Sequence, residues 1–307
     1  DNAYTEPEPI SPKKPIIVLG GFVLGLAVPF GFLYLNFLLY TKINSRSQIE
    51  NVLKGTPIVA EIPLIQTKIN KLIDRYDVSG VAEAFRILRT NLGFLRGKLN
   101  KDKASVIYVT SSTKGEGKTF IASNLTSVFA DTNKKTLLIG TDLRNPQLHN
   151  MFNLNKDAVG LTNFLSDESY VFDDLVNKNV SDKNMDVILS GPIPPNPTEL
   201  LDSPRFEQII TEAKSKYDYV IVDTAPTVHV SDTLLITHLS DVLLHVVRAE
   251  YTDIKLLDHL KELKDFNKID NMGIIINGLS PKGKYSYNYG YGYGYAAAKE
   301  KKKGLKF

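Results

Sequence analysis

An eight-residue segment rich in glycine and lysine has the spacing of a phosphate-binding loop. It reads STKGEGKT, from Ser112 to Thr119, between an apolar run and an amphipathic run. Two glycines, Gly115 and Gly117, would let backbone N–H groups converge on phosphate oxygens, and the next helix would add its positive end. Lys118 should bridge the β- and γ-phosphates, and Thr119 should ligate Mg²⁺. A glycine-rich turn without a ligand is the alternative, which the Gly-Lys-Thr ending disfavours.

Two aspartates follow apolar runs and could complete this chemistry. Asp223 ends the run YVIVD, and Asp142 follows LLIGT. Because the carboxyl ends of parallel strands meet at one edge of a sheet, both should lie near the phosphate loop. We expect Asp223 beside Thr119 as a Mg²⁺ ligand. We expect Asp142 to hold Mg²⁺ or to accept a proton from a nucleophile, with a turn or helix cap as its alternative.

The segment YSYNYGYGYGY near the C-terminus carries a tyrosine at every second position. Its spacers, Ser, Asn and Gly, build no core, and lysines flank it, so we expect a flexible tail. A row of exposed phenol hydroxyls suits an enzyme that modifies tyrosine, whereas an adhesive low-complexity end is the alternative. The candidate phosphoacceptors are Tyr285, Tyr287, Tyr289, Tyr291, Tyr293 and Tyr295.

Short apolar strands alternate with amphipathic helices through the central part of the chain. We expect strands at 105–110, 136–140, 186–190, 219–223, 242–247 and 273–277, and helices that include 118–131, 203–216 and 253–266. Since the strands are continuously apolar, helices should cover both faces of the sheet. The repeat predicts an α/β fold of the P-loop NTPase type, with a mostly parallel sheet and the ligand at the carboxyl ends of its strands.

The front of the chain carries the strongest break in composition. From Pro15 to Tyr40 there is no charged residue, and a helix of this length can cross a bilayer core of about 30 Å. Gly21 and Gly25 could let a neighbouring helix approach closely, although a chance pair is as good an explanation. Basic residues flank both ends, so charge gives only a slight preference for the C-terminal side inside.

The chain therefore divides into five expected segments. Because it begins at Asp1 without an initiator methionine, we expect a further portion to precede it. Pro57 and Pro63 should break regular structure between the membrane helix and the main domain. The expected segments are a Pro-rich extra-cytoplasmic stretch at 1–14, a transmembrane helix at 15–40, a juxtamembrane connector at 41–80, a P-loop domain at 81–282 and a flexible tail at 283–307.

Composition excludes several classes of function. The formal net charge is +3, with no basic stripe that interleaves aromatic residues, so nucleic acid is not an expected partner. The absence of cysteine excludes disulfides and thiol chemistry and fits a reducing compartment.

Together these motifs resemble the bacterial tyrosine kinases, or BY-kinases, phosphate-loop enzymes that accompany polysaccharide export. The resemblance covers almost the whole chain, including GPIPPNPTELL at 191–201, the tyrosine-rich tail where the family's autophosphorylation sites lie, and the SPKKP stretch before the membrane span. That stretch and span are similar to the last membrane span of polysaccharide co-polymerases. The resemblance implies ATP and Mg²⁺ as cofactors and a place in the bacterial inner membrane, with the kinase domain and tail in the cytoplasm.

The resemblance also implies roles for residues outside the core motifs. Glu83, Arg86 and Arg89 match the family's E-x-x-R-x-x-R helix, which docks on a neighbouring subunit to close a ring, often an octamer. A solvated helix face is the alternative. Related ATPases contact the base at positions that correspond to Arg248, Asn277 and the 194–197 loop. The expected nucleotide contacts are thus Lys114, Gly115, Glu116, Gly117, Lys118, Thr119, Phe120, Arg248 and Asn277.

The sequence departs from the family pattern at two places. The family's second acidic motif is D-x-D-x-R, but Gly140 stands where its first acid belongs, so Asp142 and Asp223 remain as the candidate acids. Lys114 stands where the family often has proline, either as a second phosphate contact or as a solvated side chain. The signature lysine of the deviant-loop partitioning ATPases would fall one residue earlier, at Thr113.

We therefore expect a membrane-anchored, ATP-dependent protein-tyrosine kinase that phosphorylates its own tail on a neighbouring subunit and regulates polysaccharide polymerisation and export. Asp142 or Asp223 would orient or deprotonate the tyrosine. The expected partners are further copies of the chain, the polymerisation and export machinery, a phosphotyrosine phosphatase and the membrane. The alternatives are a ring scaffold that has lost phosphate transfer, a membrane ATPase that cycles between assembly states, and a structural exporter part with vestigial nucleotide binding.

Overall fold

The computed structural model describes residues 14–65, 72–95, 104–182, 184–228, 232–266, 269 and 271–280. The chain forms two compact units, residues 1–42 and 43–307. The first unit contains helix α1, Lys14–Leu39. Within it, Pro15–Leu35 has a mean hydropathy of 2.4 and is the one segment of the described chain long and apolar enough to cross a membrane. The predicted apolar helix is therefore present.

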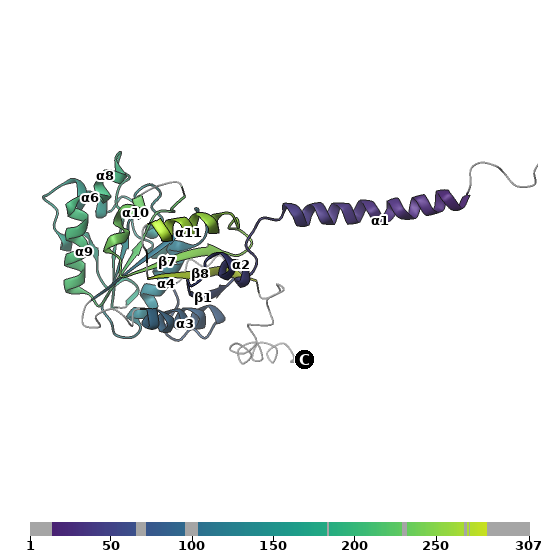
Figure 1. Ribbon diagram of the computed structural model, residues 1–307. Coiled ribbons are helices and arrows are strands. Elements are labelled where there is room, and N and C mark those ends of the chain that lie inside the picture. The colour runs from purple at the N-terminus through teal and green to yellow at the C-terminus, as the bar shows by residue number, and fades with distance from the viewer. Residues whose placement is uncertain are drawn as a thin grey trace, which may run out of the picture. The chain divides into compact units, whose positions relative to one another are not determined.

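The second unit is built on an eight-stranded sheet (Figure 1). Its strand order is β1-β8-β7-β2-β6-β3-β5-β4, and every pairing is parallel except that of β4 with β5. The strands are β1 Ile58–Pro63, β2 Ser105–Ser111, β3 Thr136–Gly140, β4 Val176–Asn177, β5 Met185–Ile188, β6 Tyr219–Asp223, β7 Val242–Arg248 and β8 Met272–Leu279. The prediction of a mostly parallel α/β sheet is confirmed.

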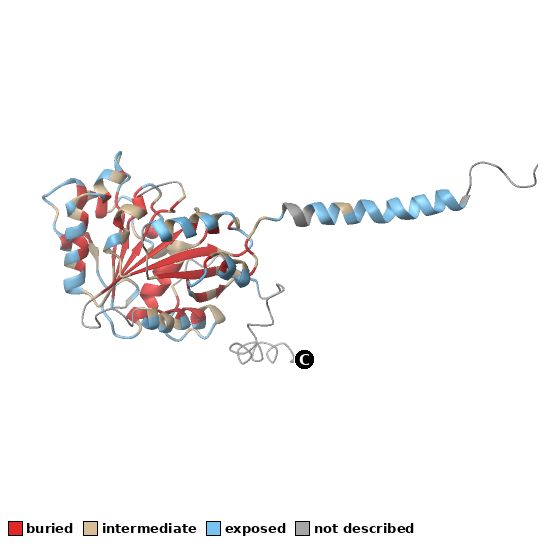
Figure 2. Cartoon of the chain, viewed as in Figure 1, coloured by how far each residue is buried: buried red, intermediate tan, exposed pale blue. Residues whose placement is uncertain are grey.

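Helices cover both faces of this sheet, as the continuously apolar strands predicted. Neighbouring residues of β2 enter different cores: Tyr108 packs into one and Ile107 into the other. Helices α3 and α4 line the Ile107 side, whereas α2, α6, α9, α10 and α11 line the Tyr108 side. Figure 2 shows the strands between these layers as buried. The helices are α2 Arg46–Val52, α3 Gly80–Leu95, α4 Lys118–Ala130, α5 Leu148–Phe152, α6 Leu161–Ser166, α7 Phe172–Leu175, α8 Pro197–Leu201, α9 Pro204–Lys216, α10 Asp232–Ile236 and α11 Leu256–Phe266.

Strand β1 was not predicted, because two prolines bracket it. Pro57 precedes the strand and Pro63 ends it, and β1 pairs with β8 alone at one edge of the sheet. An edge strand tolerates proline because one side of its backbone needs no partner within the sheet. The region expected as an irregular connector thus contributes a strand and helix α2 to the same compact unit as the P-loop.

The strand order brings the chemical motifs to one edge of the sheet. β2 lies between β6 and β7, and β6 lies between β2 and β3. In the register of these strands, Asp223 at the end of β6 lies opposite Val109 of β2 and Gly140 of β3. The loops that leave the carboxyl ends of β2, β3 and β6 therefore meet there, which is where open α/β sheets bind ligands.

Candidate active site

The loop between β2 and α4 has the backbone conformation of a phosphate cradle. Gly115 and Gly117 have φ values of +90° and +100°, which residues with a side chain seldom adopt. A Cβ atom at Gly117 would also lie 2.2 Å from Nδ2 of Asn277. Both the backbone conformation and this close contact therefore require glycine there. Helix α4 begins at Lys118, and its free N–H groups point toward the end of this loop.

Thr119 and Asp223 contact each other at the base of the loop. The Thr119 hydroxyl donates a hydrogen bond of 2.7 Å to Oδ2 of Asp223. The carboxylate is only 2% exposed, and its second oxygen, Oδ1, has no hydrogen-bond partner among the described residues. Burial raises the pKa of Asp223, although Lys118 and Thr119 act in the opposite direction. A buried carboxylate with a free oxygen beside a threonine hydroxyl is a donor set that suits Mg²⁺.

Lys118 forms a buried ion pair with Asp142. Its ammonium lies 2.9 Å from Oδ2 of Asp142, with both side chains largely buried. Burial would lower the pKa of Lys118, but the charges of Asp223 and Asp142 raise it above its ordinary value. Lys118 therefore stays cationic. The other oxygen of Asp142 accepts a hydrogen bond of 3.0 Å from the backbone N–H of Asn145, which fixes the carboxylate.

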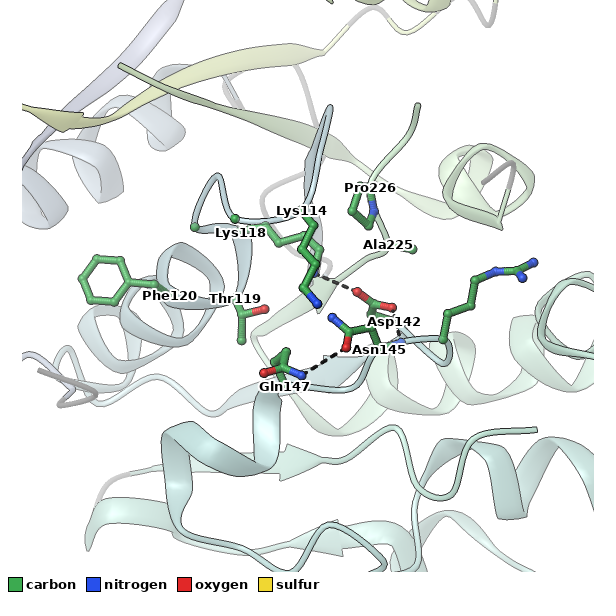
Figure 3. Close-up of a pocket in the computed structure, with 12 residues that line it drawn as sticks. Lys114, Lys118, Thr119, Phe120, Asp142, Asn145, Gln147, Ala225 and Pro226 are labelled. Carbon is green, nitrogen blue, oxygen red and sulfur yellow. Dashed lines mark hydrogen bonds and ion pairs between the residues drawn. The ribbon is translucent and has the colours of Figure 1, made fainter. Parts of the chain in front are cut away.

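These groups border a cavity of about 410 Å³ (Figure 3). In Figure 3 the side chain of Lys114 extends from the loop toward Asp142 and Asn145. Among the described residues there is no cluster of three or more His, Asp or Glu side chains that could hold a metal by itself. A Mg²⁺ ion here would therefore need phosphate oxygens or water as further ligands, which is usual for this ion. The lining residues are Lys114, Gly115, Gly117, Lys118, Thr119, Phe120, Asp142, Arg144, Asn145, Gln147, Ala225 and Pro226.

The predicted base contacts, Arg248 and Asn277, lie against the loop itself. Arg248 donates a hydrogen bond of 2.8 Å to the carbonyl of Gly115, and the amide of Asn277 donates one of 2.8 Å to the carbonyl of Glu116. Tyr251, which we did not predict, donates one of 2.9 Å to the carbonyl of Lys114. A role for Arg248 and Asn277 in binding the base stays a prediction.

A second polar cluster at the rim of the cavity was also missed from the sequence. Arg144 contacts both oxygens of the buried Asp232, at 2.7 and 3.1 Å. The hydroxyl of Thr198, at the start of α8, donates a hydrogen bond of 2.8 Å to the same carboxylate. Burial would raise the pKa of Asp232, but the bonds from Arg144 and Thr198 lower it below its ordinary value. No motif links these three positions, so only the fold could bring them together.

The three residues of the predicted docking helix lie on α3. Arg86 pairs with Glu83 at 3.4 Å and donates a hydrogen bond of 2.5 Å to the carbonyl of Asp77. Arg89 donates one of 3.1 Å to the carbonyl of Val128 on α4. Both arginines thus have bonds within the chain, and a role in contacts between subunits stays a prediction.

Gly140, where the first acid of the motif is missing, is closely packed. A Cβ atom at this position would lie 2.9 Å from Oγ of Ser190 and 3.2 Å from Cδ2 of Leu148. Ser190 also donates a hydrogen bond of 3.0 Å to the carbonyl of Gly140. A side chain at this position would therefore require Ser190 and Leu148 to shift. The six tail tyrosines, 285 to 295, lie outside the described residues.

The parallel sheet, the glycine cradle and the two carboxylates at one edge define a P-loop nucleotide-binding domain of the α/β class. Residues 104–274 match the family model described as an AAA domain. Tyrosine-protein kinase YwqD of Bacillus subtilis is 38% identical over 206 residues, covering 66% of this chain and 84% of the relative. Tyrosine-protein kinase wzc of Salmonella typhimurium is 32% identical over 296 residues, covering 91% of this chain and 40% of the relative.

Solved structures agree with these similarities. The kinase domain of the Escherichia coli tyrosine kinase ETK matches with a TM-score of 0.68 and 30% identity, covering 81% of this chain and all of that one. The BceF tyrosine kinase domain matches with a TM-score of 0.66 and 27% identity, covering 78% of this chain and 99% of that one. The chain belongs to the family of bacterial tyrosine kinases. It spans about 40% of the length of the enterobacterial relatives that it matches.

Proposed function

We propose that this chain is a membrane-anchored protein-tyrosine kinase that transfers the γ-phosphoryl group of ATP to its own C-terminal tyrosines. The observation that carries the proposal is the convergence of Lys118, Thr119, Asp142 and Asp223 at the end of a glycine cradle. Relatives that carry the name tyrosine-protein kinase support the activity. Helix α1 supports the membrane anchor, and a domain that uses ATP would then lie in the cytoplasm.

In the proposed reaction the loop N–H groups and Lys118 bind the β- and γ-phosphates. Thr119 and the free oxygen of Asp223 would hold Mg²⁺, which supplies neutralisation of phosphate charge when bound. Asp142 is among the residues that line the cavity and Asp223 is not, and Asp223 is already assigned to Mg²⁺, so we assign the proton acceptor to Asp142. A free phenol has a pKa near 10, so a base must take its proton as the phenolic oxygen attacks the γ-phosphorus and ADP leaves.

The end of the described chain supports the tail as substrate. β8 runs parallel to β7, which runs parallel to β2, so the chain leaves β8 at the same edge of the sheet as the phosphate loop. Asn277, three residues before Ser280, already contacts the carbonyl of Glu116. The described chain therefore ends after a strand that leads to the nucleotide edge of its own sheet, which supports a following tail as the substrate.

Transfer between subunits is tested by a mixing experiment. The Lys118→Met chain keeps its tyrosines but should not transfer phosphate, and a chain shortened to end at Ser280 should transfer phosphate but has no tail. Mixed with Mg²⁺ and ATP, the two should yield phosphotyrosine on the Lys118→Met chain. If the full chain modifies itself but the mixture yields no phosphotyrosine, transfer occurs within one subunit and the trans proposal fails.

We propose further that copies of the chain form a ring through α3 and that phosphorylation of the tail loosens it. Each phosphate adds close to two negative charges, which repel one another and the acidic site. Glu83 has an exposed side chain and is the best probe, because Arg86 and Arg89 also hold the chain's own backbone. Glu83→Lys should abolish the ring-sized oligomer in size-exclusion chromatography. Phosphorylation of the tail should have the same effect. An unchanged elution volume in either case contradicts the corresponding half of the proposal.

One observation favours a second candidate function. Gly140 removes an acid that the family motif places beside Asp142, and a side chain there would press on Ser190 and Leu148. Loss of that acid favours a nucleotide-dependent ring scaffold of a polysaccharide exporter, without phosphate transfer. Nucleotide-dependent assembly without any phosphotyrosine would support the scaffold over the kinase. The kinase proposal has two further parts. The kinase regulates polysaccharide polymerisation and export, and a phosphatase removes the phosphates from its tail.

A further inference from the structure

A buried carboxylate inside the phosphate loop has no part in the reaction described above. Glu116 is fully buried, although it lies in the middle of the loop. Its Oε2 accepts a hydrogen bond of 2.7 Å from the backbone N–H of Thr113, and its Oε1 accepts one from the hydroxyl of Thr252. The side chain thus links the start of the loop to a segment 136 residues away in the sequence.

Thr252 uses its single hydroxyl for two hydrogen bonds at once. It donates to Glu116 and accepts a bond of 2.9 Å from the backbone N–H of Arg248 at the end of β7. Its side chain is 1% exposed, so water cannot replace either bond. Backbone bonds with Ile43 hold the segment on its other side: Ile43 donates to the carbonyl of Thr252 at 2.9 Å and accepts from Glu250 at 2.8 Å.

The same segment bonds to the outward-facing carbonyls of the loop. Tyr251 and Arg248 donate to the carbonyls of Lys114 and Gly115, and Asn277 of β8 donates to that of Glu116. Three successive carbonyls are therefore turned away from the cavity. Since the C=O and N–H of one peptide unit point in opposite directions, the N–H groups that follow them are turned toward the phosphate site.

We propose that Thr252 is a positioning residue, which acts through Glu116 to fix the phosphate loop in its binding conformation before nucleotide arrives. A loop already held in this conformation loses less freedom when it binds phosphate, so nucleotide affinity rises. Burial raises the pKa of Glu116, and hydrogen bonds oppose that rise, with those from Thr252 and Thr113 the largest among them. The inference rests on the nucleotide site of the proposed kinase.

The test compares Thr252→Val, which keeps the shape but lacks the hydroxyl, with Thr252→Ser, which keeps the hydroxyl. The readout is the dissociation constant of a fluorescent ATP analogue, with KM and kcat for tyrosine phosphorylation measured in parallel. Thr252→Val should weaken nucleotide binding about 10-fold, as expected for loss of a hydrogen bond to a charged group. Its KM for ATP should rise more than its kcat falls, and Thr252→Ser should stay within about twofold of the parent.

A double variant tests whether Thr252 acts through Glu116. Glu116→Gln has one amide oxygen and cannot accept from both donors, so it should also weaken binding. Adding Thr252→Val to Glu116→Gln should produce little further loss, whereas losses that multiply would overturn the proposal. Parental affinity in Thr252→Val, or equal loss in Thr252→Ser, would also overturn it. If Thr252→Val does not fold, parental affinity in Glu116→Gln overturns the proposal instead. The affinity for the ATP analogue is measured without phosphate transfer. It can therefore be compared between variants even if the chain transfers no phosphate, so failure of the kinase proposal and failure of this one are distinguishable.

Discussion

The hydroxyl of Thr119 donates to Oδ2 of Asp223 at 2.7 Å, while Oδ1 of the same buried carboxylate has no partner among the described residues. The bond joins the first turn of α4 to the end of β6 and holds the carboxylate in one orientation. A buried polar atom without a partner is costly, and a bound cation would satisfy it. The pair could therefore hold the Mg²⁺ ion of the proposed reaction through residues that are already in place.

Replacing Asp223 by asparagine should raise the Mg²⁺ concentration that gives half-maximal activity. The amide can still accept from Thr119, but it carries no charge to bind a cation. We expect an increase of about 10- to 100-fold, measured as phosphotyrosine formed in a Mg²⁺ titration at fixed ATP. Asp218→Asn, which removes an exposed carboxylate paired with Lys134, serves as the matched control. An unchanged Mg²⁺ requirement in Asp223→Asn would exclude Asp223 as a ligand.

Replacing Asp142 by asparagine should reduce turnover rather than nucleotide affinity. The variant lacks the proposed proton acceptor, which predicts a loss in kcat of about 100-fold or more. Lys118 loses its ion-pair partner at 2.9 Å and stays available to the phosphates, so binding of the ATP analogue should not weaken. Single-turnover phosphorylation and equilibrium binding separate the two effects. A kcat within about threefold of the parent would reassign the base.

Introducing aspartate at Gly140 should destabilise the domain instead of restoring a missing acid. The new side chain would collide with Ser190 and Leu148, and such overpacking costs about 1–3 kcal/mol. Thermal unfolding should show the loss. Ser190→Ala removes the nearest atom, so the double variant should lose less stability than the two single variants together. Additive losses, or a Gly140→Asp protein as stable as the parent, would show that the site has room.

Stability should fall in mild acid because of His245 on β7. Burial, with a smaller contribution from His259, lowers the pKa of His245 to about 3. A group whose pKa is lowered by folding contributes its full stability above its unfolded pKa of about 6.5 and loses it as the pH falls toward the folded value. Between pH 7 and pH 5 the loss should be on the order of 2 kcal/mol.

His245→Gln provides the control for that prediction. Glutamine does not titrate and can keep the hydrogen bond of 3.0 Å that Nε2 of His245 makes with the Ser112 hydroxyl. Its free energy of unfolding, from denaturant titrations at pH 7 and pH 5, should differ less between the two conditions than that of the parent. An equal difference in both proteins would assign the acid sensitivity to other groups.

The sequence predicted those parts of the site that lie in contiguous motifs. The phosphate loop, Asp142 and Asp223 each sit at the carboxyl end of an apolar strand, so the parallel sheet alone brings them together. Thr252, Tyr251 and Asp232 escaped prediction because their bonds to Glu116, Lys114 and Arg144 each span more than 80 residues and no fixed spacing links them. Such contacts depend on how loops pack, which periodicity does not encode.

The fold also contains elements that the sequence predicted and elements that it did not. The central strands are continuous apolar runs, and β6 was predicted with its observed bounds, Tyr219–Asp223. The edge strands β1 and β4 were missed, the first because of its prolines and the second because it has only two residues, Val176–Asn177. Edge strands bury one side only, so their sequences need less of the apolar character that identifies a central strand.

The most direct test of the central claim is a phosphotyrosine map of the full chain after incubation with Mg²⁺ and ATP. Mass spectrometry should find phosphate on tyrosines between 285 and 295 in the parent and in the control Lys134→Met, whose exposed lysine pairs with Asp218 and lies outside the cavity lining. It should find none in Lys118→Met, which lacks the cation beside Asp142. ADP release without phosphotyrosine in the parent, or phosphotyrosine that persists in Lys118→Met, would contradict the account.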